Sequence, residues 1–373
     1  MEKENLNLKI KINKENDFKT KNSNRNIGID LLKLIAMINI INLHINLFTP
    51  YLKTNQNHPK YKQVYRLETF SYWPVDAFGL ISGIVGFKKY KFVNVIYIWF
   101  IYCFYSVFFT LYLSYKSVYL FRYIISSFFP LGLKRNWYVN AYIFMYSFLP
   151  FVNESISSLN KRFYNKIVLL FFFIYSIHYI INMYINNIQD YNFILRGYSV
   201  LWLLILYISG GYIGRFYLNK LLISNVIFIL IYVISSFLTS EFIINNILKG
   251  NLSRKIFLQY NSPTIIVQAL SLIFFFSNLK IKNKYIIKVI LFFNPLNLSV
   301  TIIHSRIFRS NIPQIRRLFS YIKSFTPKYL FFKIYGISIL IYFICAFIDY
   351  FRHLLFKILK IRNLSNFIEK LII

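Results

Sequence analysis

Acidic residues are scarce in this chain of 373 residues: it has 12 Asp and Glu against 44 Lys and Arg, and only 15% of its residues are charged. A soluble domain carries about 25% charged residues. Hydrophobic residues make up 57% of the chain and aromatic residues 21%, which is more apolar surface than a water-soluble protein of this length can bury. The composition therefore excludes a soluble globular protein and predicts one whose solvent is lipid.

Cysteine is almost absent, and no other pattern of metal ligands replaces it. Cys103 and Cys345 are the two cysteines of the chain, and both lie inside apolar runs. Two distant thiols supply neither a disulfide framework nor a metal-ligand spacing, so we expect both to pack against neighbouring helices. The sequence predicts no metal site and no permanently bound cofactor.

The formal net charge of +32 would indicate nucleic-acid binding in a soluble protein. Here the basic residues fall between the apolar runs, in short loops and in the two tails. Positive loops of this kind contact the anionic headgroups of membrane lipid and fix the orientation of the helices that they join. We therefore expect membrane lipid, and not nucleic acid, as the partner of these side chains.

Apolar runs long enough to cross a bilayer recur along the chain. Since about 20 helical residues span the hydrocarbon core, we predict an all-α integral membrane protein, a bundle of about ten transmembrane helices. The predicted spans are 27–48, 73–87, 93–114, 137–152, 166–184, 198–214, 221–239, 262–279, 287–307 and 329–350. Asn294 and Pro295 should kink the ninth span. Residues 118–132 are also apolar, but they contain Arg122 and Pro130, which favours a re-entrant or interfacial helix.

The charged loops and tails predict the orientation of the bundle. An even number of spans places both termini on one side of the membrane. Lysine clusters at 88–91 and 280–284 fall in short loops on that side, and the positive-inside rule assigns it to the cytoplasm of a plasma-membrane protein. The basic loop 309–328 falls on the opposite side and disagrees with this orientation.

The sequence predicts that the chain has three parts. Residues 1–26 form a basic cytoplasmic tail, and residues 27–350 form the transmembrane domain. Residues 351–373 repeat apolar residues at helical spacing, with Arg352 and Lys357 on the other face. This pattern predicts a basic amphipathic helix in the membrane interface.

Ionisable residues are costly inside a membrane, and the first span contains Asp30, Lys33 and His44. Asp30 and Lys33 are three residues apart, so they share a helix face and can pair. His44 follows Lys33 by eleven residues, which places it about 16 Å along the same face. A second polar stripe lies on the opposite face: Asn39, Asn42 and Asn46. A helix that is polar on two faces is expected at the centre of the bundle, away from lipid.

His44 suits a general base, because an unperturbed imidazole titrates near neutral pH. It could also carry an acyl group transiently, or serve only as a hydrogen-bonded packing residue. Asp30 and Lys33 could orient such a site, bind a donor substrate, or anchor the helix as an interfacial ion pair.

The run RNIGIDLLKLIAMINIINLH, residues 25–44, resembles the first helix of the acyltransferase-3 family of membrane acyltransferases. The family signature is a basic residue, ten further residues and a histidine. Lys33 and His44 match it, and Arg25 and Asp30 match as well. Further segments resemble the family in the same order: 75–83, 136–153, 201–213, 260–263 and 300–304. The closest resemblance is to polysaccharide O-acetyltransferases.

This resemblance implies ten helices and an O-acetyltransferase that takes its acetyl group from acetyl-CoA on the cytoplasmic side. The acceptor that it implies is a hydroxyl of a cell-surface polysaccharide or of its lipid-linked precursor. Asp30, Lys33 and His44 would be the catalytic residues, with His44 as general base or acyl carrier.

Binding of the donor would fall to basic residues. Many family members carry an Arg-X-X-Arg motif after the second span, where this chain has Lys88, Lys89 and Lys91. Lysine meets a phosphate as a point charge and lacks the bidentate fork of arginine. We expect these lysines, with Arg25, to contact the CoA phosphates; the alternative is that they only fix the topology.

Four other residues are candidates for acceptor binding. His304 would hold the acceptor or tune a cavity, although a packing role at the membrane interface explains it equally well. Asp76 would pair with a basic group or cap the helix that starts after Pro74. The rings of Trp137 and Tyr142 would stack on a sugar, although an aromatic belt at the membrane interface explains them equally well.

Two other functions remain open. A transporter or glycan flippase also needs polar stripes in apolar helices, but it needs no catalytic histidine. A membrane glycan polymerase is also rich in Tyr and Phe, but such enzymes usually have large external loops, which this chain lacks in the predicted topology.

Overall fold

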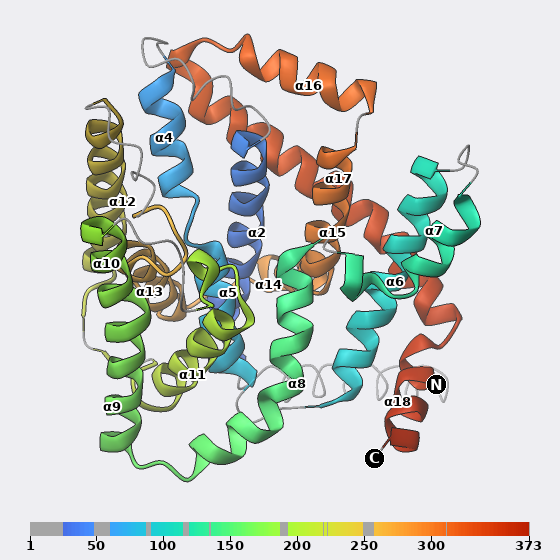
Figure 1. Ribbon diagram of the computed structural model, residues 1–373, viewed down its shortest axis with the longest axis horizontal. Helices are drawn as coiled ribbons and strands as arrows, with labels where there is room; N and C mark the ends of the chain where they lie inside the picture. The colour runs from blue at the N-terminus through green and yellow to red at the C-terminus, as the bar shows by residue number, and fades with distance from the viewer. Residues whose placement is uncertain are drawn as a thin grey trace, which may run out of the picture.

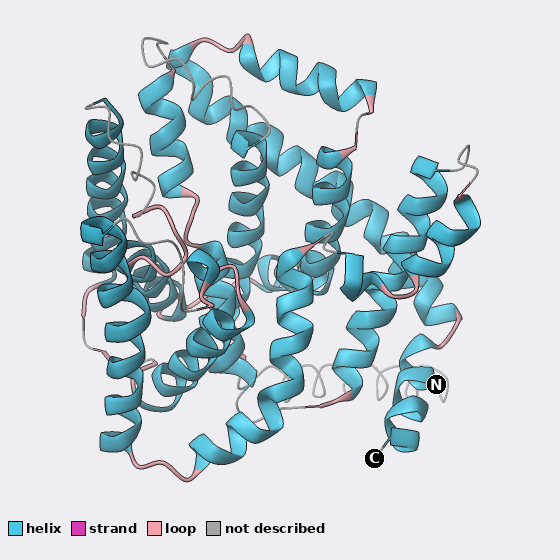
Figure 2. Cartoon of the chain, viewed as in Figure 1, coloured by secondary structure: helices cyan, strands magenta, loops and turns pink. Residues whose placement is uncertain are grey.

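The computed structural model describes residues 25–47, 60–86, 91–114, 119–133, 136–186, 193–218, 220–221, 223–248, 257–310 and 312–372. Every regular element within these ranges is helical (Figure 2). Six helical segments among them are long and apolar enough to cross a membrane: Ile27–Leu47, Val93–Leu113, Lys161–Ile185, Asn225–Asn246, Lys284–Arg309 and Leu330–Ile358. The predictions of an all-α fold and of a membrane protein are therefore confirmed.

The elements follow one another as helices of very different length (Figure 1). The longer ones are α2 (Ile27–Leu47), α6 (Val93–Ser114), α8 (Trp137–Ser157), α11 (Val200–Phe216), α12 (Asn225–Leu248), α13 (Pro263–Ser277) and α17 (Leu330–Ile358). The shorter ones are α4 (Tyr61–Phe70), α5 (Pro74–Gly86), α7 (Leu120–Ser127), η1 (Pro130–Leu133), α9 (Lys161–Phe172), η2 (Phe173–His178), α10 (Tyr179–Asn186), η3 (Leu195–Gly197), α14 (Lys284–Phe293), η4 (Asn294–Leu296), α15 (Asn297–Arg309), α16 (Pro313–Lys323), η5 (Pro327–Tyr329) and α18 (Ile361–Ile372).

Helix α2 lies in the middle of the bundle and packs against α5, α13, α14, α15 and α17 (Figure 1). Its asparagine stripe is buried, as the sequence predicted. The amide of Asn42 donates to the Ser71 hydroxyl at 2.9 Å, and Asn39 accepts from the Tyr335 hydroxyl at 2.7 Å. These amides need protein partners that lipid cannot supply, and a central helix has such partners on every side.

Glycines allow α5 and α11 to pack with their backbones almost in contact. A Cβ on Gly83 would lie 2.0 Å from the Tyr207 carbonyl oxygen, and a Cβ on Gly210 would lie 2.0 Å from that of Leu80. Neither position has room for a larger residue. Small residues at helix crossings are the usual device for close packing within a membrane.

Three features of the helices can be compared with the predicted spans. The second span is preceded by α4, which the sequence analysis missed, and the two are separated by the break Ser71–Trp73. The α-helix of the ninth span is interrupted at the predicted place, since the 3-10 turn η4, which contains Pro295, separates α14 from α15. The segment predicted as re-entrant or interfacial forms α7 and η1, and the hydroxyl of Ser127 in α7 lies 2.7 Å from that of Thr110 in α6.

The C-terminal part departs from the predicted boundary at residue 350. Helix α17 continues to Ile358, because Arg352, which we had placed on the polar face of a tail, is only 3% exposed and pairs with Asp349. The amphipathic helix is therefore α18 alone. It docks on the start of α6, where Glu369 accepts from the Val93 amide at 2.8 Å.

Breaking the buried Asp349–Arg352 pair by removing one partner should destabilise the fold strongly. Arg352 donates to both carboxylate oxygens of Asp349, at 2.8 and 2.7 Å, and the Tyr105 hydroxyl adds a third bond at 2.7 Å. The variant Arg352→Leu leaves an unpaired buried carboxylate, and we expect it to lower the free energy of unfolding by about 3–5 kcal/mol.

The midpoint of thermal unfolding in one detergent measures this loss. The double variant Asp349→Leu/Arg352→Leu should recover most of it, because no charge is left unpaired. Lys357→Leu, an exposed position on the same helix, is the matched control. A double variant no more stable than Arg352→Leu would contradict this account.

Candidate active site

Two histidines that are 260 residues apart in the sequence form a hydrogen-bonded pair inside the bundle. His44 lies in the last turn of α2, and His304 lies in α15. The Nδ1 atom of His44 is 2.8 Å from the Nε2 atom of His304, and the ring centroids are 4.9 Å apart. We call these two residues the histidine pair.

The backbone of α15 fixes which nitrogens carry protons in the pair. The Nδ1 atom of His304 lies 2.6 Å from the Val300 carbonyl oxygen, which can only accept, so this nitrogen is the donor. In neutral His304 the Nε2 atom is then an acceptor, and Nδ1 of His44 must donate to it. The Nε2 atom of neutral His44 is left with a lone pair.

The two rings differ in exposure. His304 is fully buried, with 0% of its surface accessible, whereas His44 is half-buried. No group in the described ranges forms a hydrogen bond to Nε2 of His44. His304 therefore orients the ring of His44, and Nε2 of neutral His44 is available as a proton acceptor.

Asp30, Lys33 and Arg25 form a separate charged cluster at the other end of α2. The Asp30 carboxylate, almost fully buried, accepts from Nζ of Lys33 at 3.1 Å and from Nε of Arg25. The pairing of Asp30 with Lys33 is as predicted. The cluster does not contact the histidine pair, so it can act on a reaction there only from a distance.

A cavity of about 430 Å³ begins at this cluster and extends along α2. From α2 it is lined by Lys33, Met37 and Ile40. The other lining residues come from α5, α6, α8, α11 and α15: Phe78, Ile81, Ser82, Val85, Gly86, Asn94, Ile98, Tyr138, Tyr142, Tyr146, Leu149, Tyr207, Asn297, Leu298 and Thr301. Ile40 and Thr301 are each about one helical turn before the histidine pair, four residues before His44 and three before His304, so the cavity leads from the charged cluster toward the pair.

The residues predicted to bind the acceptor separate into three places. Tyr142 lines the cavity, and His304 is the partner of His44. Trp137 lies among other aromatic rings, 4.6 Å from that of Tyr198 between centroids. Asp76 accepts from the indole N–H of Trp202 at 3.1 Å, in the first turn of α5, and no basic partner is found for it within the described ranges.

Of the basic residues predicted to contact CoA, Arg25 and Lys91 can be placed. Lys91 is exposed and precedes α6 by two residues. Lys88 and Lys89 lie outside the described residues. The described ranges contain no group of three His, Cys, Asp or Glu side chains that could hold a metal ion.

Sequence reasoning missed several residues of this site. Tyr138 and Tyr146 line the cavity together with Tyr142, and their spacing of four residues along α8 was the signal that could have identified them. Thr301 donates to the sulfur of Met37 at 3.1 Å, which joins α15 to α2 below the histidine pair. No local pattern indicates that contact.

Comparisons with known proteins assign no function to this site. No family model matches the chain, and neither does any curated protein or solved structure. The resemblance to the acyltransferase-3 family stays a prediction.

The protonation of the histidine pair can be tested directly. The variant for this test has the three other histidines replaced by glutamine. Its ¹⁵N spectra above neutral pH should show both remaining rings with the proton on Nδ1 and with Nε2 unprotonated. The reason is the chain of donors that ends at the Val300 carbonyl. In His304→Phe the constraint on His44 is removed, and its ring should show the mixture of tautomers seen in free imidazole. A proton on Nε2 of His44 in the two-histidine variant would contradict this arrangement.

Proposed function

We propose that this protein is a membrane-bound O-acyltransferase that moves an acetyl group from acetyl-CoA to a hydroxyl of a cell-surface polysaccharide or its lipid-linked precursor. One observation carries the proposal: the lone pair on Nε2 of His44, held by His304, lies about one turn beyond a cavity that begins at a cluster of charged residues. An enzyme that brings its own general base to the reactive end of a long, charged donor needs a base, a cavity and a charged cluster arranged in this order.

In the proposed reaction, Nε2 of His44 removes the proton from the acceptor hydroxyl as its oxygen attacks the thioester carbonyl. The new C–O bond forms, the C–S bond breaks, and the sulfur leaves as a thiolate that takes the proton from His44. The products are the acetyl ester and free CoA. While His44 is doubly protonated, its Nδ1–H remains bonded to His304, which keeps the ring in place between the two proton transfers.

The cavity suits the neutral arm of the donor, and the charged cluster suits its phosphates. Asp30 compensates one of the cations Arg25 and Lys33, which leaves about one net positive charge beside the cavity. Lys91 would add to the positive potential at this end. Hydroxyl groups of Tyr138, Tyr142 and Tyr146 give the apolar wall points for hydrogen bonds.

We also propose ten membrane crossings, with both termini in the cytoplasm of a plasma-membrane protein. The six segments that are long and apolar enough would make six crossings, and four more would be made by α8, by α11, by α13 and by α4 together with α5. In this arrangement the charged cluster and Lys91 lie at the cytoplasmic face, where acetyl-CoA is found, and the histidine pair lies deeper.

A transporter or flippase is the second candidate. It is favoured by one observation: α5, α8, α11 and α13 begin near one another inside the bundle, as ring contacts between residues at their starts indicate. Interrupted helices of this kind form substrate sites in many transporters. Such a protein would need no hydrogen-bonded histidine pair.

The variant His44→Ala should lower acetyl transfer by about 10²–10⁴-fold, the usual contribution of a general base. His304→Phe should also lower the rate, but less, because Nε2 of His44 survives in a mixture of tautomers. Release of free CoA and labelling of the glycan are measured together on purified protein with labelled acetyl-CoA. His178→Ala, an exposed histidine bonded to Asn182, is the control. Normal transfer by His44→Ala would remove His44 from the reaction.

Sidedness and donor entry can be tested in one experiment. In a cysteine-free background, Lys91→Cys should react with an anionic, membrane-impermeant thiol reagent only from the cytoplasmic side, and Ser324→Cys only from the outside. Modification adds an anion to the neutral cysteine, at a position where the wild type has a cation, so it should raise the KM for acetyl-CoA several-fold and leave kcat nearly unchanged. Modification of Ser324→Cys should change neither constant. Reaction of both cysteines from one side would refute the proposed topology.

A further inference from the structure

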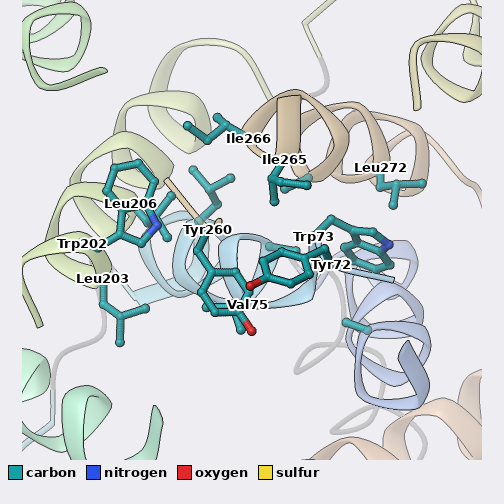
Figure 3. Close-up of a cluster of buried hydrophobic side chains, with 14 of the residues drawn as sticks. Tyr72, Trp73, Val75, Trp202, Leu203, Leu206, Tyr260, Ile265, Ile266 and Leu272 are labelled. Atoms are coloured by element: carbon teal, nitrogen blue, oxygen red, sulfur yellow. The ribbon is translucent and has the colours of Figure 1, made fainter. Parts of the chain in front are cut away.

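Four aromatic residues from distant parts of the chain form a cluster. They are Tyr72, Trp137, Tyr198 and Tyr260, which we call the aromatic cluster. The Tyr260 ring lies 4.7 Å from that of Tyr72, 4.8 Å from that of Tyr198 and 5.8 Å from that of Trp137. Figure 3 shows Tyr72 and Tyr260 side by side, with buried apolar residues of α13 above them and of α11 to the left.

Each member of the cluster stands at or just before the start of a helix: Tyr72 before α5, Trp137 at the start of α8, Tyr198 before α11 and Tyr260 before α13. The loop that carries Tyr198 has a constrained backbone, with positive φ at Arg196 and Gly197. A Cβ on Gly197 would lie 2.5 Å from the Cβ of Tyr260, so only glycine allows the two loops to meet. The helix starts therefore hold the rings in fixed positions.

One side of the aromatic cluster is open. Tyr198 is 39% exposed and Trp137 is half-buried, whereas Tyr72 and Tyr260 are buried beneath them. The hydroxyls of Tyr72 and Tyr198 lie 3.2 Å apart. A sugar ring presents C–H groups on its faces and hydroxyls at its edge, so aromatic faces with phenol groups at their rim match it in both respects.

The four residues of the aromatic cluster carry no charge, and Asp76, which follows Tyr72 by four residues in the first turn of α5, is buried. Its Oδ2 atom has no hydrogen-bond partner within the described residues and can accept a hydrogen bond. With no cation among its four residues, the aromatic cluster cannot compensate the charge of an acidic sugar, whose carboxylate would lose its hydration on binding.

Three consecutive residues connect this cluster to the proposed reaction site. The Asn136 amide donates to the hydroxyl of Ser305, the neighbour of His304, at 3.4 Å. Trp137 belongs to the aromatic cluster, and Tyr138 lines the cavity. The start of α8 thus adjoins the histidine pair, the aromatic cluster and the cavity at once.

We propose that the aromatic cluster is the acceptor subsite, that it binds an uncharged sugar ring against Trp137 and Tyr198, and that it disfavours uronic acids. This inference rests on the proposed function for its connection to acetyl transfer. Sugar binding itself requires no transfer reaction, so the two can be tested apart.

Binding is measured by saturation-transfer NMR on the full chain in lipid nanodiscs, which avoids sugar-based detergents. The probes are methyl β-glucoside and methyl β-glucuronide, which differ only at C6. The wild type should bind the glucoside at least about ten-fold more tightly than the glucuronide. Trp137→Ala and Tyr198→Ala should each weaken glucoside binding by about ten-fold, since each removes one stacking face.

Phe144→Ala is the matched control, because Phe144 is a half-exposed aromatic residue on α8 outside the aromatic cluster. It should bind the glucoside as the wild type does. Trp137→Phe should restore part of the affinity lost in Trp137→Ala, which separates loss of the ring from loss of the fold. Equal binding of the glucoside by the wild type, Trp137→Ala and Tyr198→Ala would overturn the subsite, and so would equal binding of the two probes by the wild type.

Release of CoA by the wild type in the same nanodiscs tests the acyltransferase activity separately from the sugar site. Absence of release with retained, Trp137-dependent sugar binding would refute the acyltransferase and leave the sugar site standing. Release of CoA with glucoside binding that is insensitive to Trp137 and Tyr198 would refute the sugar site and leave the acyltransferase standing.

Discussion

Polar groups within a membrane must find partners in the protein, because lipid offers none, and α2 is the helix on which this constraint acts most strongly. It carries a buried carboxylate, three buried amides and a histidine. These groups point in several directions, so no face of α2 can be given to lipid. The surrounding helices are placed by this requirement: Ser71 between α4 and α5, Tyr335 of α17 and His304 of α15 each supply a partner to α2.

The histidine pair satisfies this constraint through one contact between α2 and α15. A lone histidine in this position would have two polar nitrogens to satisfy. His304 resolves one of them, and the Val300 carbonyl fixes the direction of the hydrogen bonds. What remains is the lone pair on Nε2 of His44, a residue that follows the cavity-lining residues Met37 and Ile40 along α2.

Hydropathy was sufficient to predict the long helices, because an apolar run of sufficient length has few alternatives to crossing the membrane. It failed for α4, whose sequence contains Arg66 and Glu68 and has no apolar run. Arg66 pairs with Glu241 of α12 at 2.6 Å, and such a compensation by a distant segment is invisible in a local window. The histidine pair could not be predicted from the sequence for the same reason, since its two residues come from distant segments. Periodicity placed Asp30 with Lys33 and His44 further along α2, but only the fold brings His304 to His44.

The separation of charges along α2 bears on the choice between the two candidate functions. The charged cluster and His44 lie on one helix with Lys33 and His44 eleven residues apart, which corresponds to about 16 Å. A transported ion or small sugar would be bound at one point, and it would gain nothing from a charged group and a base that are so far apart. An acyl-CoA has a phosphorylated head, a long neutral arm and a reactive thioester at its end. The arrangement of α2, with charge at one end, an apolar and tyrosine-lined cavity beside it and a base at the other end, matches those three parts in order.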